Sequence, residues 1–216
     1  MSLKLYYASG ACSFVPHSLL ELSGAPFEPM LVKLHRGEHQ TTEYLTMNPR
    51  GQVPVLVDGS DVVTQIVAIV LHLDQRLPEA KLLPASGIER TRVLETLMWM
   101  NNTVHPTFTH VFMPQKFTDD PAAQQAVKAF NAGKYRELLE EIEARAEVAS
   151  PWLAGERPGV LDAYALTFLR WGGFAGIDPT TLPATWALAQ RFAALPAVAR
   201  VVDRERLQLN VYKPAA

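Results

Sequence analysis

The pattern of hydrophobic and polar positions over the first 24 residues predicts a strand followed by a helix. The strand runs from Leu3 to Ala8, and its two faces carry Leu3, Leu5 and Tyr7 on one side and Lys4, Tyr6 and Ala8 on the other. Ser9-Gly10 ends the strand. The helix begins at about Cys12 or Ser13 and stops at Gly24, and it tolerates Pro16 because the first helical turn leaves that N–H unused.

A second strand and a hairpin follow. Phe27 to Leu34 is the predicted strand, and the polar stretch from Arg36 to Thr42 is a predicted loop. Two apolar runs, Val55–Val57 and Val62–Val63, flank Asp58-Gly59, a pair that suits a tight turn with positive φ.

A second helix completes this module, with Thr64 as its predicted N-cap. Its apolar face consists of Ile66, Ile69, Val70 and Leu73. The order β-α-β, loop, β-β-α predicts an α/β sheet with mixed strand directions within the first 77 residues.

Beyond a short connector from Pro78 to Pro84, helical periodicity replaces the strand pattern. From Ile88, apolar residues recur at steps of three to five until Pro114 ends the helix; they are Val93, Leu97, Met100, Val104, Phe108 and Val111. A second long helix is predicted from about Pro121 to Val148, with Val127, Phe130, Leu138 and Ile142 facing inward.

The remaining chain is also predicted to be helical. Ala163 to Phe174 is apolar nearly all round, which is typical of the buried centre of a bundle. Shorter helices are predicted around Leu188 to Leu195 and from Pro196 to about Arg206. We therefore expect an α/β domain at residues 1–80, a linker at 81–86 and an all-helical domain at 87–216.

Composition narrows the classes of function. With 216 residues, 48% of them hydrophobic, the chain can bury a core without disulfides or metals. A net charge of −2 with no Lys/Arg block argues against nucleic-acid and membrane partners. We find no secretory signal and no apolar run long enough to span a bilayer. Cys12 is the only cysteine, which favours a reducing compartment, so we expect a soluble cytoplasmic protein.

The segment before the hairpin is a candidate binding edge. Gly51 and Pro54 frame Gln52-Val53, so an irregular backbone segment with unpaired N–H and C=O groups reaches the sheet edge. Such an edge can bind an extended peptide as one more strand, and the neighbouring helix start favours an anion. The combination suits a small peptide with a free carboxylate. The alternative is a hairpin that merely packs on a helix.

Cys12 is the candidate reactive group, because it lies where the first strand passes into the first helix. A helix dipole contributes about 0.3–1 kcal/mol, which lowers a thiol pKa by roughly 0.2–0.7 from about 8.5 and leaves it mostly protonated. Full ionisation of this thiol or of a ligand's thiol requires roughly 2 kcal/mol more, about one charge-assisted hydrogen bond. Tyr6 and Ser13 are the nearest hydroxyls. The alternative is a small buried hydrophobic residue.

His105 lies on the first long helix, where a lone histidine is more often structural than catalytic. No other His, Asp or Glu stands at a metal-ligand spacing from it, so we expect no metal. The chain also has no G-x-S-x-G, no phosphate-binding glycine-rich loop and no H-E-x-x-H.

Five segments in order resemble the cytosolic glutathione transferases, most closely the bacterial beta class. They are LYYASGACSFVPH, NPRGQVPVL, VTQIVAIVLHL, GVLDAYALTFLRW and LPAVARVV, and the resemblance covers nearly the whole chain. It implies a thioredoxin-like first half, a helical bundle as the second half, a two-fold homodimer, and glutathione bound between the halves.

The resemblance also implies roles for individual residues. Val53-Pro54 resembles the family's cis-proline turn, where the Val53 backbone would pair with the cysteinyl part of glutathione and the adjacent Gln52 would also bind the tripeptide. Gln65 and the Ile66 N–H would hold the γ-glutamyl end, Arg36 the glycyl end, and His105 would line the cleft. Cys12 matches the beta-class cysteine, and Tyr6 matches the catalytic tyrosine of other classes. An apolar electrophile would contact Phe14, Phe108, Phe112 and Trp171.

Two positions depart from the family pattern. Ile66 stands where Ser or Gly is usual, and losing one hydrogen bond to a carboxylate costs roughly 1.5–3 kcal/mol in binding. Gly159 replaces the usual Ser or Thr cap ahead of Asp162, at a cost of only a few tenths of a kcal/mol. We expect a glutathione transferase that detoxifies a small apolar electrophile. The alternatives are a non-catalytic binding protein, which Ile66 favours, and a glutathione-dependent thiol-disulfide reductase that uses Cys12.

Overall fold

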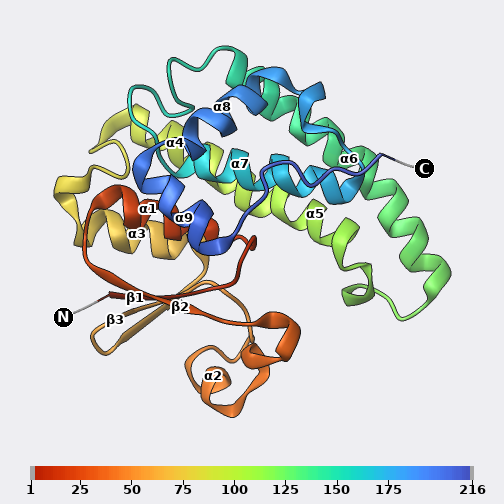
Figure 1. Ribbon diagram of the computed structural model, residues 1–216, viewed down its shortest axis with the longest axis horizontal. Coiled ribbons are helices and arrows are strands. Elements are labelled where there is room, and N and C mark those ends of the chain that lie inside the picture. The colour runs from red at the N-terminus through yellow and green to blue at the C-terminus, as the bar shows by residue number, and fades with distance from the viewer. Residues whose placement is uncertain (1–2, 215–216) are drawn as a thin grey trace. The chain divides into compact units, whose positions relative to one another are not determined.

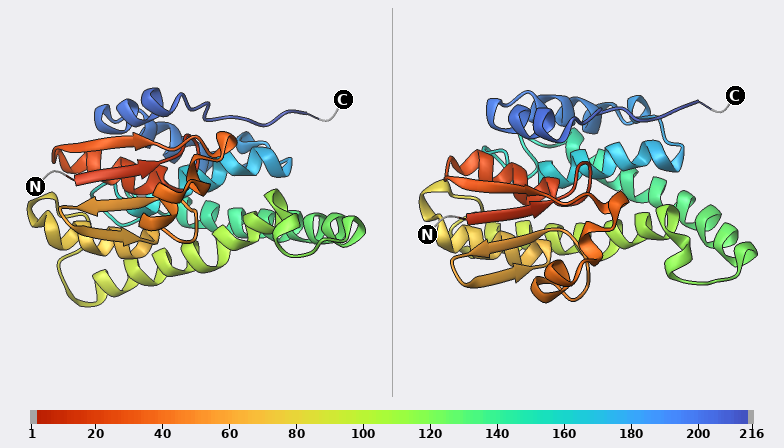
Figure 2. Two further views of the ribbon diagram at one scale, coloured as in Figure 1. Left: turned by 90° about the horizontal axis from the view of Figure 1, so that it is seen from below. Right: turned by 60° about the horizontal axis from the view of Figure 1, so that its bottom comes forward.

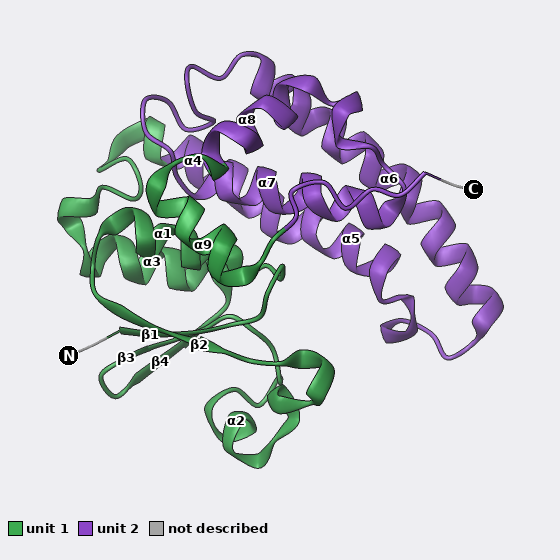
Figure 3. Cartoon of the chain, in the orientation of Figure 1, with its two compact units in different colours: residues 1–90, 193–207 green, residues 91–192, 208–216 purple. Residues whose placement is uncertain are grey.

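The computed structural model describes residues 3–214, and strands occur only in the first part of the described chain (Figure 1). It divides into two compact units, one of residues 1–90 and 193–207 and the other of residues 91–192 and 208–216 (Figure 3). The last helix, α9 (Pro196–Glu205), therefore groups with the sheet, although it comes from the far end of the sequence. The predicted linker at 81–86 stays a prediction.

A four-stranded mixed sheet forms the centre of the first unit. Its strands are β1 (Leu3–Tyr7), β2 (Phe27–Leu31), β3 (Val55–Asp58) and β4 (Asp61–Thr64), in the order β2-β1-β3-β4. β1 is parallel to β2 and antiparallel to β3, and β3 is antiparallel to β4. Both views of Figure 2 show β2 at one edge and the β3–β4 hairpin at the other. The predicted mixed sheet is confirmed.

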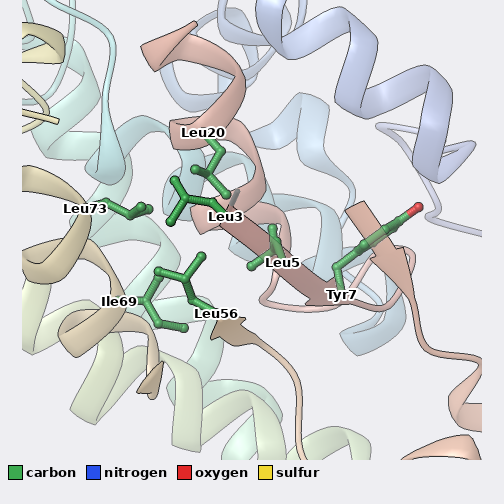
Figure 4. Packing of buried hydrophobic residues seen from close by; sticks show 7 residues of the cluster. All are labelled: Leu3, Leu5, Tyr7, Leu20, Leu56, Ile69 and Leu73. Atoms are coloured by element: carbon green, nitrogen blue, oxygen red, sulfur yellow. The ribbon is translucent and has the colours of Figure 1, made fainter. Parts of the chain in front are cut away.

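The period-two alternation of β1 gives the sheet two different faces. Leu3, Leu5 and Tyr7 are buried in one cluster with Leu20, Leu56, Ile69 and Leu73 (Figure 4). Leu20 comes from α1 (Phe14–Ser23), while Ile69 and Leu73 come from α3 (Ile66–Arg76). The other face carries a smaller cluster of Val32, Tyr44 and Val55, with Tyr6 packed against it. Figure 1 shows α1 and α3 on one face and α2 beyond the other.

Sequence periodicity missed the helix on the second face. Two short 3-10 turns, Leu34–Arg36 and Glu38–Gln40, lie at and within the predicted loop, and β2 ends at Leu31 instead of Leu34. α2 (Thr42–Met47) follows where no element was predicted. α2 has only six residues, too few to show a helical period. The hydroxyl of Thr41 caps it by accepting the Tyr44 N–H, and the Tyr44 side chain is buried.

Three predicted boundaries in this unit shift by one or two residues. α1 begins at Phe14 and ends, as predicted, at Gly24, which has φ 69. In the hairpin, Asp58 pairs with Asp61, so the turn residues are Gly59 and Ser60, and Gly59 has φ 64. The predicted N-cap of α3 was wrong, because Thr64 still pairs with Val55 in the sheet and Gln65 is the cap.

The first long helix is confirmed but contains a π-helical segment. α4 (Gly87–Trp99) continues through Met100–Val104 into α5 (His105–Phe112), and all six predicted inward residues from Val93 to Val111 are buried. Pro106 explains the irregularity. Proline has no N–H, so in a regular α-helix Pro106 could not donate a hydrogen bond to the carbonyl of Asn102, four residues earlier, and that carbonyl would stay unpaired.

The inward face of α6 (Pro121–Glu147) was partly mispredicted. Ile142 is buried as expected, but Phe130 is 68% exposed, and Tyr135 and Leu139 are the other buried hydrophobic residues of this helix. α7 (Val160–Gly172) is buried at every described position except Arg170, as its apolar sequence predicted. α8 runs from Pro183 to Ala193.

Two buried carboxylates fix chain segments in the helical unit. Asp162 accepts the Gly159 N–H at 2.8 Å and the Leu153 N–H at 3.0 Å, so α7 keeps one half of a capping box although glycine has no side chain to supply the other. Glu143 accepts the N–H groups of Ala184 and Thr185 at the start of α8, and the Thr185 hydroxyl. Within residues 3–214, no helix is both long and apolar enough to cross a membrane.

Candidate active site

A tight loop between β1 and α1 carries the thiol. The Ser13 hydroxyl accepts the Ala8 N–H at 3.1 Å and donates to the Ala8 carbonyl at 3.2 Å, which closes the loop on itself. Gly10, inside the loop, has φ 69, a left-handed conformation that glycine adopts readily. Cys12 follows, just ahead of the first residue of α1.

The Cys12 thiol lies against the turn that precedes β3. Its Sγ is 3.6 Å from the carbonyl oxygen of Val53, which makes it a weak S–H donor to that oxygen. The residue is partly exposed, and burial of the thiol raises its pKa to about 12. The N–H groups of Cys12 and Ser13 oppose this rise, whereas the charge of Glu205 adds to it. The predicted small decrease in pKa from the helix dipole is therefore overcome by desolvation, and the thiol is protonated at neutral pH.

The end of α2 fixes the Val53 turn. The Gln52 carbonyl accepts the Tyr44 hydroxyl at 2.8 Å and the Asn48 side-chain amide at 2.7 Å. The peptide bond between Val53 and Pro54 is cis, as the resemblance implied. Within residues 3–214 no protein acceptor takes the Val53 N–H. The turn therefore carries an N–H with no protein acceptor among the described residues and a carbonyl that receives the weak Cys12 S–H bond.

The start of α3 lies immediately after the hairpin. Gln65 is exposed and has φ 71 and ψ 127, a conformation that non-glycine residues rarely adopt. Ile66 is 4% exposed and lies on the same buried helical face as Ile69, Val70 and Leu73. Its side chain thus points into the protein, and the first N–H groups of the helix have no intrahelical acceptor.

Other predicted site residues lie elsewhere or have side chains that are already engaged or buried. Tyr6 lies on the opposite sheet face, where its ring contacts Tyr44 edge-on at 6.1 Å. The Ser13 hydroxyl already donates to Ala8. Phe14 is buried, with 1% exposed, and Arg36 is exposed on a 3-10 turn.

Predicted residues of the helical unit form an aromatic cluster. Trp171 contacts His105 with ring centroids 5.2 Å apart and stacks on Phe108 at 4.6 Å. Phe108 in turn stacks on Phe112, which is 54% exposed and contacts Phe174. Burial, with a smaller effect of Lys116, lowers the pKa of His105 to about 4, so its imidazole is neutral at pH 7.

The sequence patterns did not identify a buried pair beside the loop, formed by His17 and Glu205 next to Tyr7. Tyr7 lies on the α1 face of the sheet, and its ring is 4.6 Å from that of His17. His17 pairs with Glu205 of α9, and Glu205 also accepts the Gly10 N–H. The predicted alternation of β1 already placed Tyr7 on this face, whereas no local pattern indicated the pairing of His17 with Glu205. Among residues 3–214, no cluster of three or more His, Cys, Asp or Glu side chains is arranged to hold a metal.

The strand order, the cis-proline turn before β3 and the thiol at the start of α1 define a thioredoxin-like protein with an added helical unit. Residues 1–75 match the model of the glutathione S-transferase N-terminal domain, and residues 100–196 match that of the C-terminal domain. The chain belongs to the glutathione S-transferase family.

Individual relatives agree with this assignment. Glutathione S-transferase GstA of Escherichia coli O157:H7 is 31% identical over 209 residues, covering 95% of this chain and 100% of that protein. A sphingomonad glutathione S-transferase solved with glutathione is 32% identical, with a TM-score of 0.82 and coverage of 95% and 100%. A beta-class enzyme from Sphingomonas chungbukensis is 29% identical, with a TM-score of 0.81 and the same coverage.

These comparisons confirm the predicted family, its likeness to the beta class and the two-part fold. They support the prediction of a transferase with glutathione as co-substrate. No finding favours the non-catalytic or the reductase alternative over it. The roles of individual site residues stay predictions.

Proposed function

We propose that this chain is a cytoplasmic, homodimeric transferase that conjugates the glutathione thiolate to a small apolar electrophile. One observation carries the proposal: the Cys12 thiol and the carbonyl of Val53 meet at 3.6 Å, at a turn whose N–H is unused. A carbonyl oxygen has two lone pairs, so it can accept a second hydrogen bond from a ligand. Neither a nucleic acid nor a membrane is part of this function.

The Val53 turn is the proposed docking edge for the cysteinyl residue of glutathione. Its free N–H and its carbonyl form a donor–acceptor pair of the kind that an antiparallel strand presents. A tripeptide paired there would place its thiol beside Cys12. Tyr44 and Asn48, which hold Gln52, keep this edge in place before the ligand arrives.

The γ-glutamyl carboxylate is assigned to the start of α3, beside Gln65. The N–H groups and the positive end of the helix dipole favour an anion there. Because the Ile66 side chain is buried, it leaves these N–H groups accessible and removes only the hydroxyl that other members use. Arg36, on its exposed turn, is the proposed partner of the glycyl carboxylate.

Cys12 is assigned the role of a hydrogen-bond donor to the bound thiolate. A thiol with a pKa of about 12 is a poor nucleophile at neutral pH, but it retains its proton, which it can turn from its weak 3.6 Å bond with the Val53 carbonyl to the ligand. Tyr6 lies on the opposite sheet face and the Ser13 proton is already donated, so Tyr7 is the better hydroxyl candidate on β1. His105 enters the proposal from the resemblance alone.

The electrophile is assigned to the aromatic cluster of Phe108, Phe112 and Trp171. Stacked rings with an exposed edge favour a small apolar molecule. Phe14 has too little exposed surface to contribute.

Calorimetric titration with glutathione tests binding, and an activated chloronitrobenzene tests conjugation. We expect heat at millimolar glutathione and adduct formation. No heat at that concentration would contradict the proposal. Cys12→Ala should reduce conjugation and Tyr7→Phe should reduce it further, with Tyr6→Phe as the matched control on the other sheet face. A disulfide-reduction assay on the same variants tests the reductase alternative, which requires a Cys12–glutathione mixed disulfide visible by mass spectrometry.

A further inference from the structure

A buried cluster joins the end of α9 to the loop that carries Cys12. The Glu205 side chain is completely buried, as is that of His17. One Glu205 oxygen, Oε2, accepts the Gly10 N–H at 2.9 Å, and the other, Oε1, lies 2.7 Å from His17 Nδ1. On the far side of the imidazole, Arg204 Nη1 lies 3.0 Å from His17 Nε2.

The donors in this cluster fix the position of the histidine proton. A guanidinium has only donors, so His17 Nε2 must accept from Arg204. The ring proton is therefore assigned to Nδ1, which donates to Glu205. Both carboxylate oxygens thus receive an N–H group, one from α1 and one from the Cys12 loop. Burial of a carboxylate is unfavourable unless such bonds compensate it.

We infer that Glu205 is a positioning residue for Cys12, holding the loop between β1 and α1 through the Gly10 N–H while His17 and Arg204 fix the carboxylate. The inference rests on the proposed role of Cys12 beside glutathione. Its test uses no glutathione, so it can fail while the proposed function stands.

Several charged or titratable groups lie in or next to this buried cluster: Tyr7 on β1, His17 and Glu21 on α1, and Arg200, Arg204 and Glu205 on α9. Both arginines bind Glu21, at 2.8 Å for Arg200 and 2.7 Å for Arg204, so their charges are shared with a second carboxylate. After burial itself, the Glu205 charge raises the pKa of both Cys12 and Tyr7. Glu205 therefore acts on the thiol through its position and through its charge.

Two substitutions separate these effects. Glu205→Asp keeps the charge but is one methylene shorter and loses its reach to Gly10. Glu205→Gln keeps the length but removes the charge. Its NH2 group would face one of the two N–H donors, Gly10 N–H or His17 Nδ1–H, that now bind the carboxylate. Because Cys12 is the only cysteine, alkylation by iodoacetamide, followed by mass spectrometry across pH, reports this thiol alone. Exchange of the Gly10 amide hydrogen, followed by NMR, reports the loop.

We expect Glu205→Asp to speed exchange of the Gly10 amide about tenfold or more. We expect Glu205→Gln to shift the alkylation profile to lower pH, with a rate at pH 8 about threefold or more above that of the parent protein. Should Glu205→Gln not fold, the exchange measurement on Glu205→Asp still decides the inference.

Glu143→Gln is the matched control, since Glu143 is also a buried carboxylate that accepts backbone N–H groups, but at the start of α8. It should lower stability and leave the Cys12 profile and the Gly10 exchange unchanged. Parent-like Gly10 exchange in Glu205→Asp would overturn the inference. An equal change in the Cys12 profile with Glu143→Gln would also overturn it, because general destabilisation would then be the cause.

Discussion

Tyr44 donates its phenolic hydroxyl to the backbone carbonyl of Gln52, with 2.8 Å between the two oxygens. This bond joins a six-residue helix to the turn at which Val53 presents its N–H and carbonyl. Asn48, at the end of the same helix, reaches the same oxygen at 2.7 Å. The proposed docking edge is thus held from the sheet face opposite α1 and α3, by the helix whose Tyr44 also completes the buried cluster on that face.

Tyr44→Phe should weaken glutathione binding without removing the ring that packs against Tyr6. The lost hydrogen bond is worth about 0.5–1.5 kcal/mol, which corresponds to a roughly two- to tenfold weaker affinity if the edge loosens by that amount. Calorimetric titration measures it. Thr46→Ala is the control, because its hydroxyl bonds only within α2, to the Thr42 carbonyl. Equal affinities of Tyr44→Phe and the parent protein would show that α2 does not position the edge.

Ile66→Ser should strengthen glutathione binding and weaken the fold. A hydroxyl at the start of α3 would donate a hydrogen bond to the γ-glutamyl carboxylate. This should raise the affinity for glutathione about tenfold or more. Loss of the buried isoleucine should lower the free energy of unfolding by about 2–4 kcal/mol. Calorimetry and urea denaturation measure the two effects separately.

Val67→Ser makes a similar change one position along the helix, about 100° around its axis, and should not improve affinity. If both serine variants bind glutathione like the parent protein, the γ-glutamyl carboxylate has been assigned to the wrong place.

His105→Gln should make the protein less sensitive to acid. The pKa of His105 in the folded protein is about 4, below the ordinary 6.5, so the unfolded chain takes up the proton first as the pH falls. The stability associated with neutral His105 is therefore present above about pH 6.5 and is lost as the pH falls towards 4. We expect this loss to be about 1–3 kcal/mol, allowing for the partial exposure of the ring.

Urea denaturation at pH 7, 5.5 and 4.5 measures this difference. Asp162 has the opposite sign, since burial raises its pKa to about 6 and favours the folded state at low pH. Because both proteins contain Asp162, its contribution to the pH dependence of stability cancels when the two are compared. Parallel stability profiles of His105→Gln and the parent protein would contradict the prediction.

Glu143→Gln should destabilise the helical unit by about 2–4 kcal/mol, because one carboxamide oxygen cannot replace two carboxylate oxygens that receive three donors. Thermal and urea denaturation measure the loss. Glu140→Gln is the control on the same helix, since Glu140 is exposed and lies 3.9 Å from Arg136 in a weak ion pair. Equal stabilities of the two variants would show that Glu143 does not anchor α8.

Sequence periodicity predicted those parts of the fold that depend on long or regular patterns. The alternation in β1 corresponds to one buried face, Leu3, Leu5 and Tyr7, and the all-round apolar character of α7 corresponds to burial at nearly every position. α2 escaped prediction because tertiary burial of Tyr44 and one cap stabilise it, not a repeating pattern. Phe130 was assigned inward although it lies on a charged helix, where a single aromatic residue does not establish a face.

The candidate site was predictable where its parts are close to an element boundary. Cys12 at the start of α1 and Val53 before β3 both follow from strand ends, and the structure brings them into contact. Tyr6 was chosen as a nearby hydroxyl and then from the family resemblance, without using the strand alternation that places Tyr7 on the α1 face. Glu205 lies 195 positions from Gly10, and a contact over that distance leaves no trace in local sequence.

The grouping of α9 with the sheet has a consequence for biosynthesis. During translation the four strands emerge from the ribosome long before residue 205. Until then His17 has no Glu205 carboxylate to accept its hydrogen bond. The sheet unit must therefore wait for the whole helical segment to be translated before its last buried contact can form. A fragment that ends near residue 90 should remain incomplete at the same point and expose the face of α1 that α9 covers.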